Sequence, residues 1–406
     1  MKVLVICGEC VQVNTSSNLC CLAYLKGLVD AGNEVTLLSA DNRGYSIDPD
    51  MVIPLSVKHY TYRGMTFYEK LSELKKKTHK QAQHTTNQNK DIRSHKSIVS
   101  IIKKKVFSLY GVHGTYIKFE RKARRFRSEE DYDIVISLST PATSHLIAYC
   151  LLNSGHVKSK NWVQVWEDPW YGDMDGYYAS EEVLREEKRI LGLADRVCYV
   201  SPITLEYQKN RFPESAHKMF WVPLPSYYYE NEQKATSYDK YVFGYFGEYC
   251  LPARNLKPFY QAAKKTGIEV NICGNSNLGL ESTSNIHIYP RLELSRLRPI
   301  EDSSNVLVFL CNCKGGQIPG KIYQYAATDK KILFILDGTY DEKRILKEFF
   351  GKFNRFVFCE NNQESIQIGI NNIINNKIGN VKNIPLLDFS SDNIVRQILK
   401  EGTKLL

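Results

Sequence analysis

One lysine stands where a loop is expected to become a helix, in the stretch PGKIYQYAATDKKILFI at residues 319–335. Pro319 interrupts regular structure before the lysine, and the apolar run at the end of the stretch is typical of a buried strand. The first N–H groups of a helix have no partner inside the helix, and a lysine beside them adds a full positive charge. Lys321 therefore predicts a binding site for an anion.

A second cation and two carboxyl groups are the other residues that could do chemistry. Arg254 lies in CLPARN, in the loop between a predicted strand and a predicted helix. Glu167 and Asp168 follow a predicted strand in WEDPW, where a carboxylate could position or deprotonate a hydroxyl group. Asp168 also fits the capping of a turn before proline, and Glu167 takes its role if the strand ends one residue earlier.

Two series of alternating strands and helices must position these residues. Short apolar strands separated by helices predict βαβ units, and βαβ units build parallel sheets. The first series occupies residues 1–222, the polar and turn-rich stretch 223–241 predicts a linker, and the second series occupies residues 242–390. The segment 391–406 is a candidate for a helix that crosses back to the first domain.

This pattern predicts an α/β protein with two doubly wound, Rossmann-like domains that face a cleft. Ligands of such folds bind at the carboxyl ends of the strands. We therefore expect the loops that follow the strands to line the cleft, at residues 8–18, 139–145, 247–254 and 311–321.

The eleven cysteines are scattered, and they complete neither a zinc pattern nor a full disulfide framework. They indicate small core residues in a reducing compartment, which favours a cytoplasmic protein. No apolar run is long enough to span a membrane, and the first residues predict a buried strand rather than a secretory signal.

The positive charge is concentrated in one segment. Residues 70–127 hold seventeen Lys or Arg residues and three acidic residues, whereas the whole 406-residue chain has a net charge of +10. This segment belongs to a basic insertion at about 58–127, in which Ile98, Ile102, Val106 and Leu109 share one helical face. Such a helix fits the surface of an anionic membrane, or it packs on the domain with a solvated basic face. The segment contains no recognisable nucleic-acid-binding module, so we expect no nucleic acid partner.

The order of several stretches resembles glycosyltransferase family 4, which has the GT-B fold. In the second half, FGYFGEYCLPARNLKPFYQAA, VNICGNSN and PGKIYQYAATDKKILFI resemble its donor-binding domain. In the first half, ISLSTPATSHLIAYCLL, NWVQVWEDPWYGD and ADRVCYVSP resemble the acceptor domain of members that build bacterial surface polysaccharides. The resemblance covers nearly the whole chain.

The resemblance implies transfer of a sugar from a nucleotide diphosphate sugar to a saccharide acceptor, which we expect to be lipid-linked. It also implies retention of configuration and a reaction without a metal or another cofactor. The implied catalytic residues are Lys321 and Arg254, which oppose the charge of the leaving diphosphate, and Asp168 on the acceptor side. The implied donor-binding residues are Gly247, Arg254, Gly274, Gly320, Lys321 and Gln324. The candidate acceptor-side residues are Ser16, Ser17, His145, Glu167 and Asp168, of which His145 also fits a buried or surface histidine with no such role.

The chain departs from the family at three positions. Gln324 stands where a glutamate usually holds the ribose hydroxyls, Gly316 stands where a second glutamate is common, and Glu248 replaces an arginine that often follows Gly247. Two other classes therefore stay open. One is a nucleotide-sugar 2-epimerase of the same architecture, and the other is a binding protein that kept the fold without catalysis.

Overall fold

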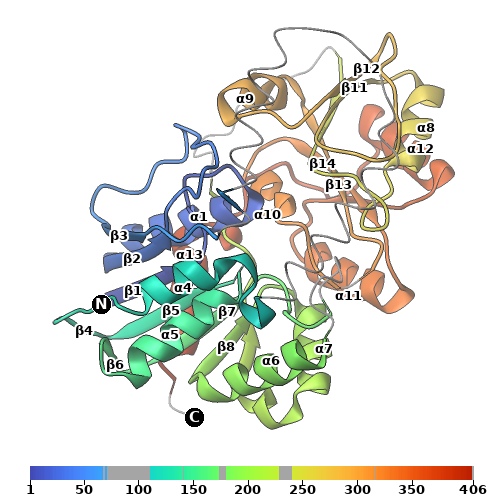
Figure 1. Cartoon of the computed structure of the whole chain (residues 1–406). Coiled ribbons are helices and arrows are strands. Elements are labelled where there is room, and N and C mark those ends of the chain that lie inside the picture. Colours follow the sequence, from blue (N-terminus) through green and yellow to red (C-terminus); the bar gives the residue numbers. More distant parts are fainter. Residues whose placement is uncertain are drawn as a thin grey trace, which may run out of the picture.

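The described residues form two large parallel sheets in separate halves of the molecule (Figure 1). A short parallel pair, β4 (Asp131–Tyr132) with β6 (Lys158–Ser159), lies in the first half. The computed structural model describes residues 1–66, 69–70, 110–139, 141–172, 180–227, 240–314 and 316–404. The predicted α/β class with two Rossmann-like domains is confirmed. The apolar face predicted at Ile98–Leu109 and most of the stretch 223–241 lie outside the described residues. In the described ranges, no helix has the length and apolar character needed to cross a bilayer.

The first sheet has seven parallel strands in the order β3-β2-β1-β5-β7-β8-β9. Apolar residues fill β1, β5 and β7 because helices cover both faces of a sheet of this kind. Its strands are β1 (Lys2–Cys7), β2 (Glu34–Ala40), β3 (Lys58–Tyr62), β5 (Ile134–Leu138), β7 (Trp162–Trp166), β8 (Arg196–Tyr199) and β9 (Met219–Trp221). The helices of this half are α1 (Ser16–Asp30), α4 (Ile117–Ala123), α5 (Thr143–Asn153), α6 (Glu181–Leu193) and α7 (Pro202–Arg211).

The second sheet has six parallel strands in the order β12-β11-β10-β13-β14-β15. Its strands are β10 (Val242–Phe246), β11 (Glu269–Cys273), β12 (Ile286–Tyr289), β13 (Val306–Leu310), β14 (Lys331–Leu336) and β15 (Val357–Glu360). Its helices are α8 (Lys257–Thr266), α9 (Leu294–Ser303), α10 (Lys321–Ala326), α11 (Tyr340–Gly351) and α12 (Gln363–Ile374). The predicted strands of both series are confirmed, whereas β3, β9 and α7 were not predicted.

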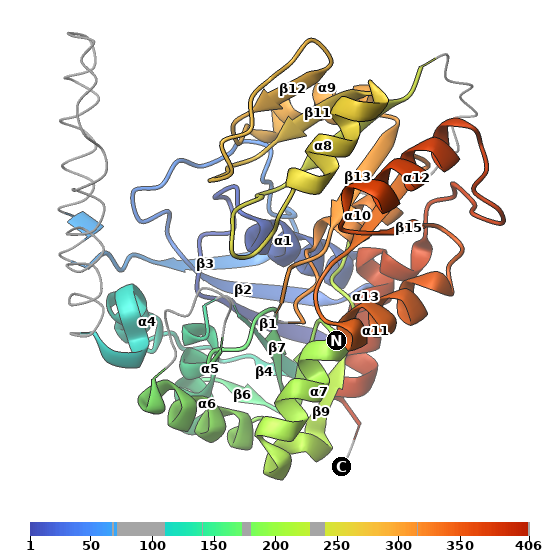
Figure 2. The ribbon, with the colours of Figure 1, turned by 90° about the vertical axis from the view of Figure 1, so that its right-hand side faces the viewer.

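The final helix, α13 (Ser391–Gly402), packs against α1 of the first half and lies beside β8 of the first sheet (Figure 2). The contact is close, because a Cβ added to Gly27 would lie 2.2 Å from the carbonyl oxygen of Ser391. One hydrophobic cluster continues from the first sheet through α1, α13 and α10 into the second sheet. Since β9 ends at Trp221 and β10 begins at Val242, we propose to divide the domains within 223–241 and to count α13 as a brace on the first.

A buried carboxyl group fixes the turn that follows β7. Glu187 of α6 is fully buried, and it accepts hydrogen bonds from the backbone N–H groups of Trp170 (3.1 Å) and Tyr171 (2.6 Å). These bonds hold the chain just after Asp168. Burial raises the pKa of Glu187 to about 7, against the lowering effect of the two N–H groups and of Arg211.

We expect the Glu187→Gln variant to gain stability relative to the natural protein as the pH rises. An unfolded glutamate loses its proton near pH 4.3, whereas folded Glu187 keeps its proton to about pH 7, so its contribution to stability is present at low pH and is lost as the pH rises through that range. Glutamine does not ionise, and the contributions of the other titrating groups to the pH dependence are the same in both proteins and cancel in the comparison. Thermal unfolding at about pH 5 and about pH 8 measures the effect.

Glu186→Gln is the matched control, because Glu186 is the neighbouring residue and pairs with Arg189 on the surface. A difference in melting temperature between Glu187→Gln and the natural protein that is the same at both pH values would contradict the assignment.

Candidate functional site

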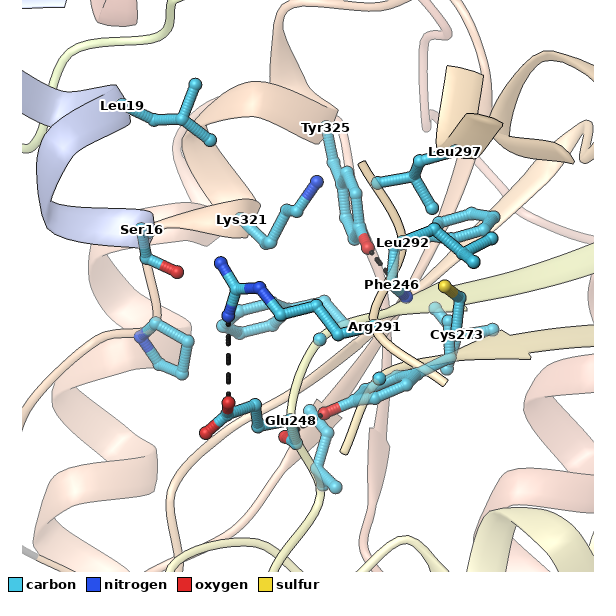
Figure 3. A pocket seen from close by; sticks show the side chains of 18 of the residues that line it. Ser16, Leu19, Phe246, Glu248, Cys273, Arg291, Leu292, Leu297, Lys321 and Tyr325 are labelled. Carbon is cyan, nitrogen blue, oxygen red and sulfur yellow. Dashed lines mark hydrogen bonds and ion pairs between the residues drawn. The ribbon is translucent and has the colours of Figure 1, made fainter. Parts of the chain in front are cut away.

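A cavity of about 250 Å³ opens at the carboxyl ends of β10, β11 and β13, opposite the start of α1 (Figure 3). The second half supplies most of its wall, from the ends of β10, β11 and β13, the loops after the strands, and helices α9 and α10. Asn14, Ser16 and Leu19 supply the wall from the first half. Both polar and apolar groups line it. The cavity lies where a doubly wound fold binds ligands, at the strand ends between the two halves.

Lys321 lies in this cavity as the first residue of α10. Its Nζ atom is 3.4 Å from Oε1 of Glu301 and 5.9 Å from the centre of the Tyr325 ring. Both members of the ion pair are about one quarter exposed. The helix is only six residues long, so the side chain rather than the helix dipole supplies the positive charge here.

Arg254 also lines the cavity, and its described contacts are to neutral acceptors. Its Nε donates to Oδ1 of Asn312 (2.8 Å), and its NH1 group donates to the carbonyl of Glu248 (2.8 Å). The guanidinium therefore has a fixed orientation and keeps its net charge. The structure thus brings Lys321 and Arg254 to one cavity.

A third cation, Arg291, was not predicted. Its NH2 group donates to the carbonyl of Asn14 (3.0 Å), and its NH1 group lies 3.6 Å from Oε1 of Glu248, as Figure 3 shows. Arg291 therefore connects the loops of the two halves at the cavity. Its position two residues after β12 could have identified it, because the end of a parallel strand is a ligand edge.

Three predicted glycines line the cavity, and one of them permits a close backbone approach. A Cβ added to Gly274 would lie 1.9 Å from the carbonyl oxygen of Gly247, so no side chain fits at this position. Gly320 precedes Lys321 and lines the same wall. Gln324 is half-buried on α10, and it is not among the described residues that line the cavity.

The first half brings Ser17 and Glu167 together. Ser16 begins α1 and is exposed at the cavity, and the next residue, Ser17, forms a hydrogen bond with the carboxyl group of Glu167. Burial, and then the nearby charge of Asp168, raise the pKa of Glu167 well above its usual value, although the bond from Ser17 opposes the shift. Glu167 is therefore protonated at a pH at which an ordinary carboxyl group is ionised.

Asp168 lies between the two halves, where it accepts a hydrogen bond from the side-chain amide of Gln317. The preceding residue, Gly316, has φ of +71° and would place an added Cβ 2.5 Å from Cγ2 of Ile203. A side chain at position 316 would therefore require Ile203 to move and would be strained by the positive φ.

His145 is enclosed by the core. It is fully buried, its Nδ1 lies 2.7 Å from Oγ of Ser137, and its ring packs on Trp166 at 4.2 Å between ring centres. Burial lowers its pKa to about 3, so the ring is neutral. A contact with an acceptor requires an accessible side chain, and we therefore do not retain His145 as an acceptor-side residue.

Within the part of the chain that the structure describes, no group of three or more His, Cys, Asp or Glu residues is placed to hold a metal ion.

Comparison with solved structures shows the fold. TarM matches with a TM-score of 0.60 at 10% identity, over 99% of both chains. The lipopolysaccharide outer core galactosyltransferase WaaB matches with a TM-score of 0.54 at 13% identity, over 99% of this chain and 100% of that one. A glycosyltransferase from Rickettsia africae matches with a TM-score of 0.54 at 11% identity, over 98% of this chain and 97% of that one. No family profile and no curated protein sequence matches. The chain therefore has the two-domain GT-B fold of these glycosyltransferases.

Proposed function

We propose that the protein is a glycosyltransferase that moves a sugar from a nucleotide diphosphate sugar to a saccharide acceptor, with retention of anomeric configuration. The observation that carries this proposal is the cavity between the halves. Lys321, Arg254 and Arg291 line it, beside the loop that leads into α1. A nucleoside diphosphate brings the negative charge that three cations can bind. The fold supports the proposal, because solved glycosyltransferases share it.

On the donor side, breaking the glycosidic bond leaves growing negative charge on the diphosphate. Lys321 and Arg254 stabilise this charge best if they are held in place before the reaction, as Asn312 holds Arg254. To contact the diphosphate, Lys321 must break its ion pair with Glu301 or contact both groups at once, since Lys321 and Glu301 are paired in the free protein. Gln324 stays a candidate for contact with the ribose hydroxyls, because a glutamine can both donate and accept hydrogen bonds.

Arg291 compensates for the missing arginine of the family pattern. The position after Gly247 holds Glu248, which is an acid where a cation is common, and Glu248 pairs with Arg291. We propose that Arg291 supplies the positive charge on this side of the cavity. Glu248 then orients the guanidinium and does not contact the diphosphate.

On the acceptor side, Asp168 positions or deprotonates the attacking hydroxyl group. Glu167 is the neighbouring carboxyl group, which accepts the hydrogen bond from Ser17, and its raised pKa favours the neutral form, so we assign the role of base to Asp168.

We further propose that the acceptor is linked to a lipid and that the enzyme acts in bacterial surface polysaccharide synthesis, on the cytoplasmic face of a membrane. The basic segment 70–127 supports membrane contact. Its described part includes α4, on which Lys118, Arg121 and Lys122 are exposed.

Incubation with UDP-glucose, UDP-galactose, UDP-N-acetylglucosamine and GDP-mannose tests the class of function. Slow hydrolysis of one donor supports the transferase. Conversion of a donor to its epimer would instead show the 2-epimerase, and binding of a donor without turnover would show the non-catalytic protein.

We expect Lys321→Ala to lower turnover about a hundredfold to a thousandfold, with a smaller loss of donor affinity. The lysine opposes charge that grows in the transition state, so its removal affects the rate more than binding. Steady-state kinetics with the active donor and calorimetry with its nucleoside diphosphate measure the two effects. Lys257→Ala is the control, because Lys257 also begins a helix but is exposed outside the cavity. Normal turnover in folded Lys321→Ala would refute the assignment.

Asp168→Asn should slow transfer about a hundredfold and leave donor affinity within about threefold, since Asp168 acts on the acceptor. The same assays apply. A large loss of nucleotide affinity with an unchanged rate would place Asp168 on the donor side instead.

Membrane binding should depend on charge. Co-sedimentation with phosphatidylglycerol liposomes should fall as salt rises, and Lys118→Glu combined with Lys122→Glu should weaken it about tenfold. Lys264→Glu combined with Lys265→Glu is the control, because these residues form an exposed lysine pair on α8 of the other half. Equal binding to neutral phosphatidylcholine liposomes, or no binding to either kind, would contradict the proposal.

A further inference from the structure

One chain of hydrogen bonds runs from Arg254, which lines the cavity, to Asp168, which lies between the halves and is not among the described residues that line the cavity. It begins at Arg254, whose Nε donates to Oδ1 of Asn312 at 2.8 Å. The amide Nδ2 of the same Asn312 donates to the backbone carbonyl of Gln317 at 3.1 Å. The side chain of Gln317 then donates to the carboxylate of Asp168 in the other half.

The loop that carries this chain is fixed to the first half by a second set of contacts. The carbonyl of Gly316 accepts hydrogen bonds from Oγ of Ser201 (2.5 Å) and Oγ1 of Thr204 (3.4 Å). Both hydroxyl groups are buried at the start of α7. The carbon Cα of Gly316 packs on Ile203 so closely that a side chain would not fit. The backbone at Gly316 is therefore held against the start of α7, and Gln317 is presented to Asp168 from this position.

Only the last link, from Gln317 to Asp168, joins the two halves, and the two links before it lie within the second half. Arg254 and Asn312 belong to the second half, and Asp168 belongs to the first. The Asp168 carboxylate has a defined distance and direction from the Arg254 guanidinium only while Asn312 and Gln317 connect them. A reaction that breaks one bond near Arg254 and forms another near Asp168 needs this alignment, since a misplacement of about 1 Å can lower a rate about a hundredfold.

We infer that Asn312 and Gln317 are positioning residues, which hold the acceptor-side carboxylate of Asp168 in register with the diphosphate-binding Arg254. This inference rests on the proposed function. Neither residue needs to contact the donor or the acceptor, because Gln317 acts through Asp168 and Asn312 acts through Arg254 and Gln317. The amide of Gln317 also stabilises the ionised form of the carboxylate to which it donates.

The test compares the rates at which single and double variants hydrolyse a nucleotide sugar, with water as the acceptor. The substrate is the donor of the panel above that the natural protein turns over fastest. Gln317→Ala should lower kcat at least about tenfold and leave the KM for the donor and the Kd of its nucleoside diphosphate within about threefold. Gln317→Glu should lower kcat further, because it places a second carboxylate against Asp168. Asn312→Ala should lower kcat in the same direction as Gln317→Ala.

The decisive variant combines Gln317→Ala with Asp168→Asn. If Gln317 acts through Asp168, the double variant should have the kcat of Asp168→Asn alone, within about twofold. A purely structural role for Gln317 would lower kcat again in the double variant, and this result would overturn the inference. The control is Gln261→Ala, an exposed glutamine of α8. Thermal unfolding verifies that each variant is folded.

The two proposals fail in different ways. A natural protein that turns over no nucleotide sugar would remove the proposed function, and this inference with it. A normal natural rate that Gln317→Ala leaves unchanged would overturn the inference alone.

Discussion

All strands of the two large sheets run parallel, so the loops that follow the strands gather at one edge of each sheet. In a parallel sheet every strand ends at the same edge, and the return helices lie on the faces. Residues that are far apart in sequence therefore meet: Asn14 follows β1, Arg254 follows β10, Arg291 follows β12, and Lys321 follows β13. The packing of α13 on α1 joins the half that carries the second sheet to the first. The cavity is a consequence of this arrangement.

Charge balance is the second constraint on the cavity. Three cations in a partly buried space repel one another, and the protein offsets this repulsion with Glu301 and Glu248. Arg254 is instead held by neutral oxygen atoms. Under the proposed function, a diphosphate takes the place of Glu301 at Lys321, so its net binding energy is smaller than three new ion pairs would suggest. Such an arrangement favours a ligand whose charge increases during the reaction.

The sequence was sufficient for most strands of the two large sheets and for part of the site. Apolar runs such as KVLVIC and KILFIL have one physical interpretation when helical patterns flank them, and they became β1 and β14. Lys321, Arg254 and Ser16 could be predicted because each stands beside the end of a strand or the start of a helix. The pairing of Lys321 with Glu301 could not, because it depends on how α9 packs beside α10. Arg291 and the link from Gln317 to Asp168 arise from contacts between the halves, which leave no local pattern. The prediction for His145 failed because a polar residue near the ligand edge of a sheet can still be enclosed by packing, here against Trp166.

The most direct measurement of the central claim is a crystal structure of the protein with the nucleoside diphosphate of its active donor. The account predicts that diphosphate oxygens lie within hydrogen-bond distance, about 2.7–3.2 Å, of Nζ of Lys321 and of the Arg254 guanidinium. It also predicts that Lys321 no longer pairs with Glu301 alone. A diphosphate bound elsewhere, with the pair between Lys321 and Glu301 unchanged, would contradict the account.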